Sequence, residues 1–368
     1  MKLSMLTLAV SAIALSTQGV AQQSNDGLER ALADLNSGLV ADSHAGVSIS
    51  GDARIRNNWT EDAGRKDIDT RIRLNFTANV NESVSAYIGT VSASEWGDGN
   101  GAGAGDVEQA YLSVNSLFGD GGAWTIGQKH TTVASGRVIG YDDWQNNDGG
   151  VQGIWYAHDA GGSNLSIGVH EGQSGGSDLL TVEFDWGLNI PGMGDVTIAP
   201  YYMADRDGGL QFGAGGSNTT LGAEFTGDFL GFGFDADMAK QGDEDATAFG
   251  LSLNIDALGA IPGVSGGAVD FMRSTASGGF DATDAVSWGA AGLNDSALWS
   301  NAETTQFGVS FSPAEGWSGR LARVENDGGN EWDITMNHTF GGGVAGWFGY
   351  QSNDDAANTL WMTLGVDF

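Results

Sequence analysis

The sequence contains no cysteine, only 4 proline residues and far fewer cations than anions. A chain of 368 residues without cysteine depends on a large core or a closed sheet, because no disulfide bond can stabilise it. Its 15 lysine and arginine residues face 47 aspartate and glutamate residues, giving a formal net charge of -32 at pH 7. Such acidity argues against nucleic acid and other polyanions as partners, and it also suits solubility in a salty habitat.

Long apolar runs are also missing after the first residues. Leu3–Leu15 is apolar, follows a positive start and precedes small residues of the kind that a signal peptidase accepts. This run is shorter than the roughly 20 apolar residues of a bilayer-spanning helix. The sequence therefore predicts a signal peptide over 1–21, cleaved after Ala21. The next residues, 22–46, contain apolar residues at helical spacing and are predicted to form a short N-terminal periplasmic segment.

Glycine is abundant, and the chain is not strongly hydrophobic. The 60 glycine residues are spread among strand-like and turn-like segments instead of occupying every third position, which excludes collagen. The mean hydropathy of -0.16 resembles that of a soluble protein. A transmembrane β-barrel has a similar value, because only alternate residues of its strands face lipid.

From Val47 onward, apolar and polar residues alternate with a period of two, which predicts β-strands. The segment 67–80 alternates over its whole length, which is longer than the five or six residues usual in soluble proteins. About eighteen such segments follow one another: 47–59, 67–80, 83–95, 106–116, 122–131, 150–158, 162–171, 178–188, 195–204, 217–227, 229–239, 246–257, 265–275, 302–312, 316–325, 330–340, 343–351 and 357–368.

The order of the connections and the last strand both indicate an outer-membrane barrel. Short turns alternate with longer connections, notably 96–105, 132–149, 205–216 and 276–301. The final strand is amphipathic and ends in Phe368, which resembles the assembly signal of bacterial outer-membrane barrels. The fold is predicted to be all-β, a transmembrane antiparallel β-barrel of about 18 strands over 47–368, with 16 as the alternative count. The predicted location is the outer membrane of a Gram-negative bacterium, in contact with its lipid and lipopolysaccharide.

The predicted inward face of the first two strands carries four arginine residues: Arg54, Arg56, Arg71 and Arg73. Pairing through the intervening turn is expected to place Arg54 opposite Arg73 and Arg56 opposite Arg71. Like charges that face each other repel, so water, a bound anion or loop carboxylates must offset them. The alternative is that these arginines pair with Asp52 and Asp69 on the same faces. Other inward positions are acidic: Glu183, Asp185, Glu224, Asp235, Asp237, Glu331 and Asp333.

The connection 132–149 is predicted to fold into the lumen as a constriction, because long ordered loops are usually functional. Arg137 is expected to anchor or line this constriction, while Asp142 and Asp143 face the arginine residues. Tyr141 and Trp144 are expected to pack the loop against the barrel. With Lys129 just before the loop, the predicted pore-lining residues are Arg54, Arg56, Arg71, Arg73, Lys129, Arg137, Asp142 and Asp143.

These features resemble bacterial porins, and one region resembles the alginate-export family of outer-membrane barrels. The matching segments are Val107–Leu112, Gly127–Lys129, Arg137–Asn146 and Gly150–Val151. The resemblance implies an 18-stranded pore for a polysaccharide or for small polar solutes. An alginate exporter needs a strongly basic lumen, whereas most of this chain is acidic. The resemblance therefore supports the predicted fold more than it supports alginate as the substrate.

The function predicted from the sequence is passive diffusion of small hydrophilic solutes and ions through a water-filled porin that favours cationic or neutral solutes. The alternatives are a channel for an acidic polysaccharide such as alginate, or an outer-membrane receptor or hydrolase. No histidine lies at a spacing that suggests a catalytic triad, so an enzyme is not expected. No cofactor is expected, although loop carboxylates offer weak Ca²⁺ candidates. The protein is expected to be a monomer or a homotrimer.

Overall fold

The computed structural model describes most of the chain after residue 45. The described residues are 46–61, 66–96, 106–141, 150–171, 178–191, 194–205, 219–229, 232–255, 266–278, 280, 303–327, 329–354 and 357–368. The predicted signal peptide, nearly all of the predicted periplasmic segment, and Asp142, Asp143 and Trp144 lie outside this range.

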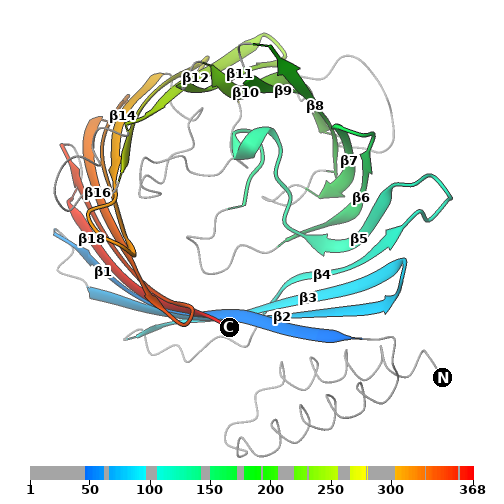
Figure 1. The fold of residues 1–368 in the computed structure, drawn as a ribbon, viewed down its shortest axis with the longest axis horizontal. Coiled ribbons are helices and arrows are strands. Elements are labelled where there is room, and N and C mark those ends of the chain that lie inside the picture. Colours follow the sequence, from blue (N-terminus) through cyan, green and yellow to red (C-terminus); the bar gives the residue numbers. More distant parts are fainter. Residues whose placement is uncertain are drawn as a thin grey trace, which may run out of the picture.

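The described residues form one sheet of 18 strands, closed into a barrel (Figure 1). The strands are β1 (Val47–Thr60), β2 (Lys66–Asn81), β3 (Val84–Trp96), β4 (Asp106–Asn115), β5 (Ala123–Lys129), β6 (Val151–Asp159), β7 (Ser163–Glu171), β8 (Asp178–Ile190), β9 (Gly194–Asp205), β10 (Thr219–Phe229), β11 (Phe232–Gln241), β12 (Glu244–Asn254), β13 (Gly267–Ala276), β14 (Glu303–Phe311), β15 (Trp317–Asn326), β16 (Gly329–Gly341), β17 (Val344–Asn353) and β18 (Thr359–Asp367). The predicted strand count is confirmed, and each predicted boundary lies within a few residues of the observed one.

The barrel closes where the first strand pairs with the last. β1 runs antiparallel to both β2 and β18, so neither edge of the sheet is left unpaired. The terminal Phe368 takes part in the closure, because its backbone exchanges hydrogen bonds of 2.9 and 3.0 Å with Gly51. A Cβ at Gly51 would lie 2.2 Å from the carbonyl oxygen of Arg73, so the close approach of the strands there requires glycine.

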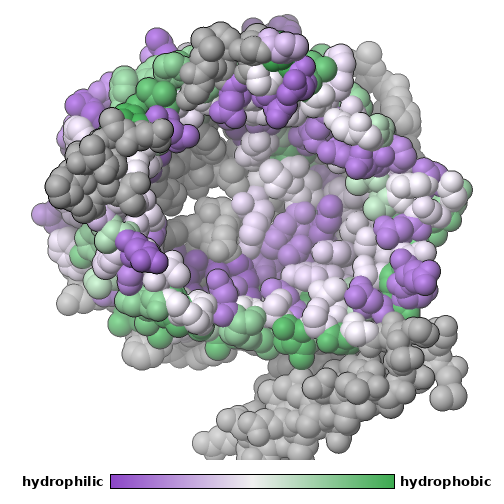
Figure 2. All heavy atoms as spheres, viewed as in Figure 1, coloured by the Kyte–Doolittle hydropathy of each residue, from purple (hydrophilic) through white to green (hydrophobic). Residues whose placement is uncertain are grey.

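The two faces of the barrel wall differ in polarity in the way the alternation predicts. On β16, the outward Trp332 and Ile334 are 45% and 39% exposed, whereas the inward Glu331 and Asp333 are 3% and 0% exposed. Figure 2 shows hydrophilic residues around the opening and hydrophobic residues along parts of the outer rim. An apolar exterior around a polar interior is the pattern of a barrel that spans a membrane. Among the described residues, no helix is both long and apolar enough to cross a membrane.

Outward aromatic side chains gather at the end of the barrel where β1 begins and β18 ends. Trp124 lies 4.8 Å from Tyr156 between ring centroids, and Trp317 stacks on His338 at 4.3 Å. Such rings are typical of the level where a barrel meets the lipid headgroups. Tyr156 lies over Gly122, where a Cβ would come within 2.2 Å of the ring.

The connections at this end are mostly short, as predicted; residues 82–83 join β2 to β3, and 342–343 join β16 to β17. The opposite end carries the long connections, 130–150, 206–218 and 277–302. It also has two short turns, 242–243 and 327–328, so the asymmetry is a tendency and not a strict rule.

Candidate functional site: a charged lumen with an inserted loop

The connection between β5 and β6 turns into the barrel, where its short helix η1 (Ala134–Gly136) lies inside the ring of strands (Figure 1). Val133 and Ile139, which flank this helix, pair with each other in an antiparallel bridge. Ala134, Ser135 and Gly136 have φ angles of 53°, 50° and 88°, in the left-handed region that costs energy for residues with a side chain. Contacts between the loop and the wall must offset this backbone strain.

Arg137 supplies the strongest of these contacts. The residue is 2% exposed, and its Nη2 donates to both carboxylate oxygens of Asp235 at 2.7 Å. Its Nη1 lies 3.4 Å from carboxylate oxygens of both Glu224 and Asp237. The guanidinium group is therefore held in an acidic pocket formed by β10 and β11, and the loop is anchored to that wall.

The pocket keeps Arg137 charged although it is buried. Burial alone would lower the pKa of Arg137, but the hydrogen bonds that it donates to Asp235 and the charges of the three carboxylates raise it above its usual value. Ser135 adds a second link by donating its hydroxyl to Glu224 at 2.6 Å. Arg137 was expected to anchor or line the constriction, and the structure places it against the acidic residues of β10 and β11.

An apolar contact between the loop and the wall accompanies the ion pairs. The buried loop side chains are Val133, Ala134, Val138 and Ile139. They belong to one cluster with wall residues Leu179, Tyr201, Ala239, Ala246, Ala248, Met272 and Ala276, together with Phe280. Sequence reasoning missed this cluster. The sequence did contain an indication of an apolar contact there, because the inward positions 246 and 248 of β12 are alanine although the lumen is otherwise polar.

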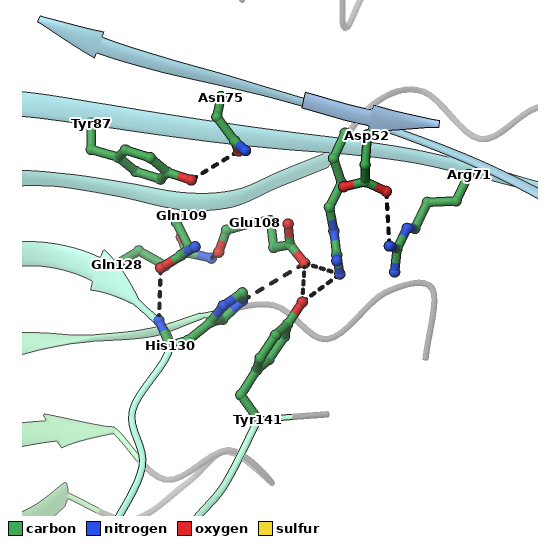
Figure 3. A network of polar contacts seen from close by, with 10 residues as sticks. Asp52, Arg71, Asn75, Tyr87, Glu108, Gln109, Gln128, His130 and Tyr141 are labelled. Carbon is green, nitrogen blue, oxygen red and sulfur yellow. Dashed lines mark hydrogen bonds and ion pairs between the residues drawn. The ribbon is translucent and has the colours of Figure 1, made fainter. Parts of the chain in front are cut away.

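His130 and Tyr141 of the inserted loop both lie against Glu108 of β4, which also binds an arginine residue of β2 (Figure 3). Glu108 Oε1 accepts hydrogen bonds from Arg73 at 2.7 Å and from Tyr141 at 3.0 Å. Tyr141 also accepts a hydrogen bond from Arg73. His130 stacks on Tyr141 with ring centroids 3.4 Å apart, and its Nε2 lies 3.7 Å from Glu108. Burial, together with Glu108, raises the pKa of Tyr141, although Arg73 opposes the shift, so its hydroxyl remains a donor.

The register of β1 and β2 differs from the prediction. Arg54 lies opposite Arg71, while Arg56 lies opposite Asp69 and Arg73 lies opposite Asp52. The predicted pairs, Arg54 with Arg73 and Arg56 with Arg71, are wrong. The observed ladder continues to Trp59 opposite Lys66, which moves the centre of the turn and lets opposite charges meet.

Carboxylates on the strands offset the arginine residues, as the alternative interpretation held. Arg56 pairs with Asp69 at 2.7 Å, and Arg71 pairs with Asp52 at 2.8 Å. With Glu108, three carboxylates among the described residues pair with arginine residues of this wall, which carries four guanidinium groups. The loop carboxylates Asp142 and Asp143 were predicted to face the same wall, but they lie outside the described residues.

Lys129 lies at the root of the loop on β5. Its Nζ is 4.8 Å from the centre of the Trp155 ring, a cation–π geometry, and Trp155 stacks on His170. A recess of about 140 Å³ separates this part of the wall from the start of the loop. Its lining includes Lys129, Thr131, Trp155, Thr181 and Glu183.

The weak Ca²⁺ candidates predicted on the loops were Asp205 with Asp207, Asp243–Asp245, and Asp354 with Asp355. Asp207 and Asp355 lie outside the described residues. Within the described ranges, no group of three or more histidine, cysteine, aspartate or glutamate side chains is arranged to hold a metal ion.

No family model matches the chain, and no curated protein matches it. Among solved structures, the chain is similar to mutants of the porin of Rhodopseudomonas blastica. For two of these mutants, with five and three substitutions, the TM-score is 0.50 at 14% identity, and the match covers 88% of this chain and 100% of theirs. The chain therefore has a porin-like fold. At this identity the similarity shows the fold alone, and the resemblance to the alginate-export family stays a prediction.

Proposed function

We propose that the protein is an outer-membrane porin that lets small hydrophilic solutes and ions diffuse through a water-filled lumen. The observation that carries this proposal is the inserted loop, which Arg137 anchors inside a closed barrel with a polar inner face. A loop that is bound to the wall on two sides narrows the lumen, and solutes can pass it without a conformational change, which suits passive diffusion. The porin-like fold supports the same interpretation, and a channel needs no catalytic residues.

The charges in the lumen favour cationic or neutral solutes. Three of the arginine residues of β1 and β2 are engaged with Asp52, Asp69 and Glu108, while the inward acidic residues of β8, β10 and β11 outnumber Arg137. The two sets of opposite charge create a field across the lumen, and acidic groups dominate the whole chain. The same pairing weighs against an acidic polysaccharide such as alginate, because four of the arginine residues are bound to carboxylates.

Planar-bilayer recording of the refolded protein in a salt gradient tests the proposal. We expect an ohmic channel whose reversal potential shows a weak preference for cations, with detergent-only bilayers as the control. Clear anion preference would reject the proposed selectivity, and absence of conductance would reject the channel itself. Block by uronate oligomers would instead support the polysaccharide channel. Chemical cross-linking in detergent would separate a monomer from a homotrimer.

A further inference from the structure

Asp333 on β16 is a buried carboxylate to which no described residue donates a hydrogen bond. Its side chain points into the barrel, the residue is 0% exposed, and neither carboxylate oxygen has a hydrogen-bond partner in the part of the chain that the structure describes. Asp69 and Glu108, which are also buried on the inner wall, each accept a hydrogen bond from an arginine residue. Asp333 therefore differs from Asp69 and Glu108.

The neighbours of Asp333 in the sheet do not supply a donor. It lies opposite Ala322 on β15, whose side chain is apolar, and opposite Gln351 on β17. The amide nitrogen of Gln351 donates to Glu331 Oε2 at 2.7 Å. Glu331 lies two residues before Asp333 on the same inward face and is 3% exposed. Two buried carboxylates are thus neighbours on one face of β16.

Among the described residues, Arg320 is a cation whose charge acts on Asp333, but its guanidinium group binds another carboxylate. Its Nη1 and Nη2 donate to the two carboxylate oxygens of Asp270 at 2.8 and 2.7 Å. Gly308 makes this possible, because a Cβ there would lie 2.5 Å from Nη2 of Arg320 and 2.5 Å from Asp270. The wall is therefore built so that Arg320 reaches toward Asp270 on β13.

An ionised carboxylate without donors is costly to bury, by several kcal/mol even after relaxation, and an adjacent carboxylate increases that cost. Buried polar groups without partners are rare in native proteins and usually indicate an ion, a water molecule or a functional role. A proton or a metal cation would neutralise the charges of Asp333 and Glu331.

We propose that Glu331 and Asp333 bind a divalent cation of the Ca²⁺ type on the inner wall of the barrel. Two carboxylates balance the charge of one such ion, and hard cations of this type prefer oxygen ligands. Gln351 and Thr335, which flank Asp333 across and along the sheet, carry further side-chain oxygens, and water completes the coordination. With two carboxylates the affinity resembles that of extracellular calcium modules, with a Kd of about 10⁻⁴–10⁻³ M. These residues differ from the loop carboxylates predicted as calcium candidates.

Equilibrium dialysis of the refolded, metal-free full chain against radioactive Ca²⁺ tests this site. Because the chain is strongly acidic, the informative quantity is the difference between wild type and variant. We expect wild type to bind about one more Ca²⁺ per chain than D333N, and E331Q to bind at least tenfold more weakly at that site. E82Q is the matched control, since Glu82 lies exposed in the turn after β2, and it should retain wild-type binding.

Thermal unfolding gives a second measurement. Ca²⁺ should raise the Tm of wild type and E82Q but not of D333N. If D333N fails to fold, E331Q provides the same comparison. Equal Ca²⁺ binding by wild type and D333N would overturn the proposal. A carboxylic-acid band in the infrared spectrum that persists in Ca²⁺ and disappears in D333N would also overturn it, because a proton would then occupy the site.

Discussion

The lumen holds two charged regions that are built in opposite ways. At β10 and β11, one arginine residue is surrounded by three carboxylates, and that arginine belongs to the inserted loop. At β1 and β2, four arginine residues face three carboxylates, and the arginines belong to the wall itself. The first arrangement joins two parts of the chain that are far apart in sequence. The second is largely a ladder between neighbouring strands, in which Arg73 and Glu108 also contact Tyr141 of the loop.

The difference predicts unequal effects of mutation. Removing the cation from the acidic pocket leaves buried carboxylates without their partner and also releases the loop. We call the arginine residues of β1 and β2 the arginine wall. Removing one of them leaves other arginine and carboxylate side chains in that wall, and the charges of these side chains still balance one another. Glu108 lies between these cases, because it belongs to the wall but also binds Tyr141 of the loop.

The largest effect is expected for R137M. Breaking a buried ion pair by removing one partner typically costs about 3–5 kcal/mol, so the free energy of unfolding should fall by about that amount. Loss of the anchor should also raise single-channel conductance, since the loop no longer holds its position in the lumen. Urea titration and bilayer recording measure the two effects. R273M is the matched control, because Arg273 pairs with Glu303 on the exposed outer surface.

Unchanged conductance in a folded R137M protein would show that the loop does not narrow the pore. A loss of stability as small as that of R273M would show that the acidic pocket contributes little. Either result would remove the contrast between the two charged regions.

A smaller loss is expected for E108Q. Hydrogen bonds to charged groups contribute about 1.5–3 kcal/mol each, and the amide retains an acceptor, so a loss of about 2 kcal/mol is expected. The double variant R73M/E108Q should lose less than the sum of the two single variants, because both remove the same ion pair. Additive losses in the double-mutant cycle would mean that Arg73 and Glu108 act independently.

The sequence could not predict which charged side chains of the lumen pair with one another. The alternation of apolar and polar residues identified the strands and the inward acidic positions, including Glu224, Asp235 and Asp237. It did not predict that Arg137 would meet those three, because the path of a loop through the lumen has no periodicity. The β1–β2 register was missed for a related reason. Residues on one face remain on that face when the register shifts by two, so the alternation cannot distinguish such registers.

The Tyr141 hydroxyl is expected to make stability depend on alkaline pH. Its pKa is raised above the ordinary value of 10.0, so the folded state holds the proton more tightly than the unfolded state does. The contribution of Tyr141 is fully present below pH 10 and decreases as the pH rises through the folded-state pKa. Y141F should therefore lose about 1 kcal/mol relative to wild type near pH 8, and the difference should shrink above pH 10. A constant difference from pH 8 to pH 11 in urea titrations would contradict the shift.

A substitution in the arginine wall should change the ion selectivity of the channel but hardly change its free energy of unfolding. R54Q removes one positive charge from that wall and relieves the repulsion between Arg54 and Arg71, which lie directly opposite each other. The reversal potential in a salt gradient should move toward stronger cation preference, while the free energy of unfolding changes by less than about 1 kcal/mol. A large loss of stability would mean that Arg54 holds the wall together as Arg137 holds the loop.

The smallest effect is expected for K240M, which breaks an ion pair outside the lumen. Lys240 lies 3.2 Å from Asp245, and both side chains are more than half exposed, at 60% and 65%. Exposed pairs of this kind contribute roughly 0–1 kcal/mol, because water and salt screen them. Comparing K240M with R137M separates the effect of losing a charge from the effect of burial, since both variants remove one cation from a carboxylate partner. If K240M and R137M lowered the free energy of unfolding equally, burial in the acidic pocket would not be what makes the loop anchor strong.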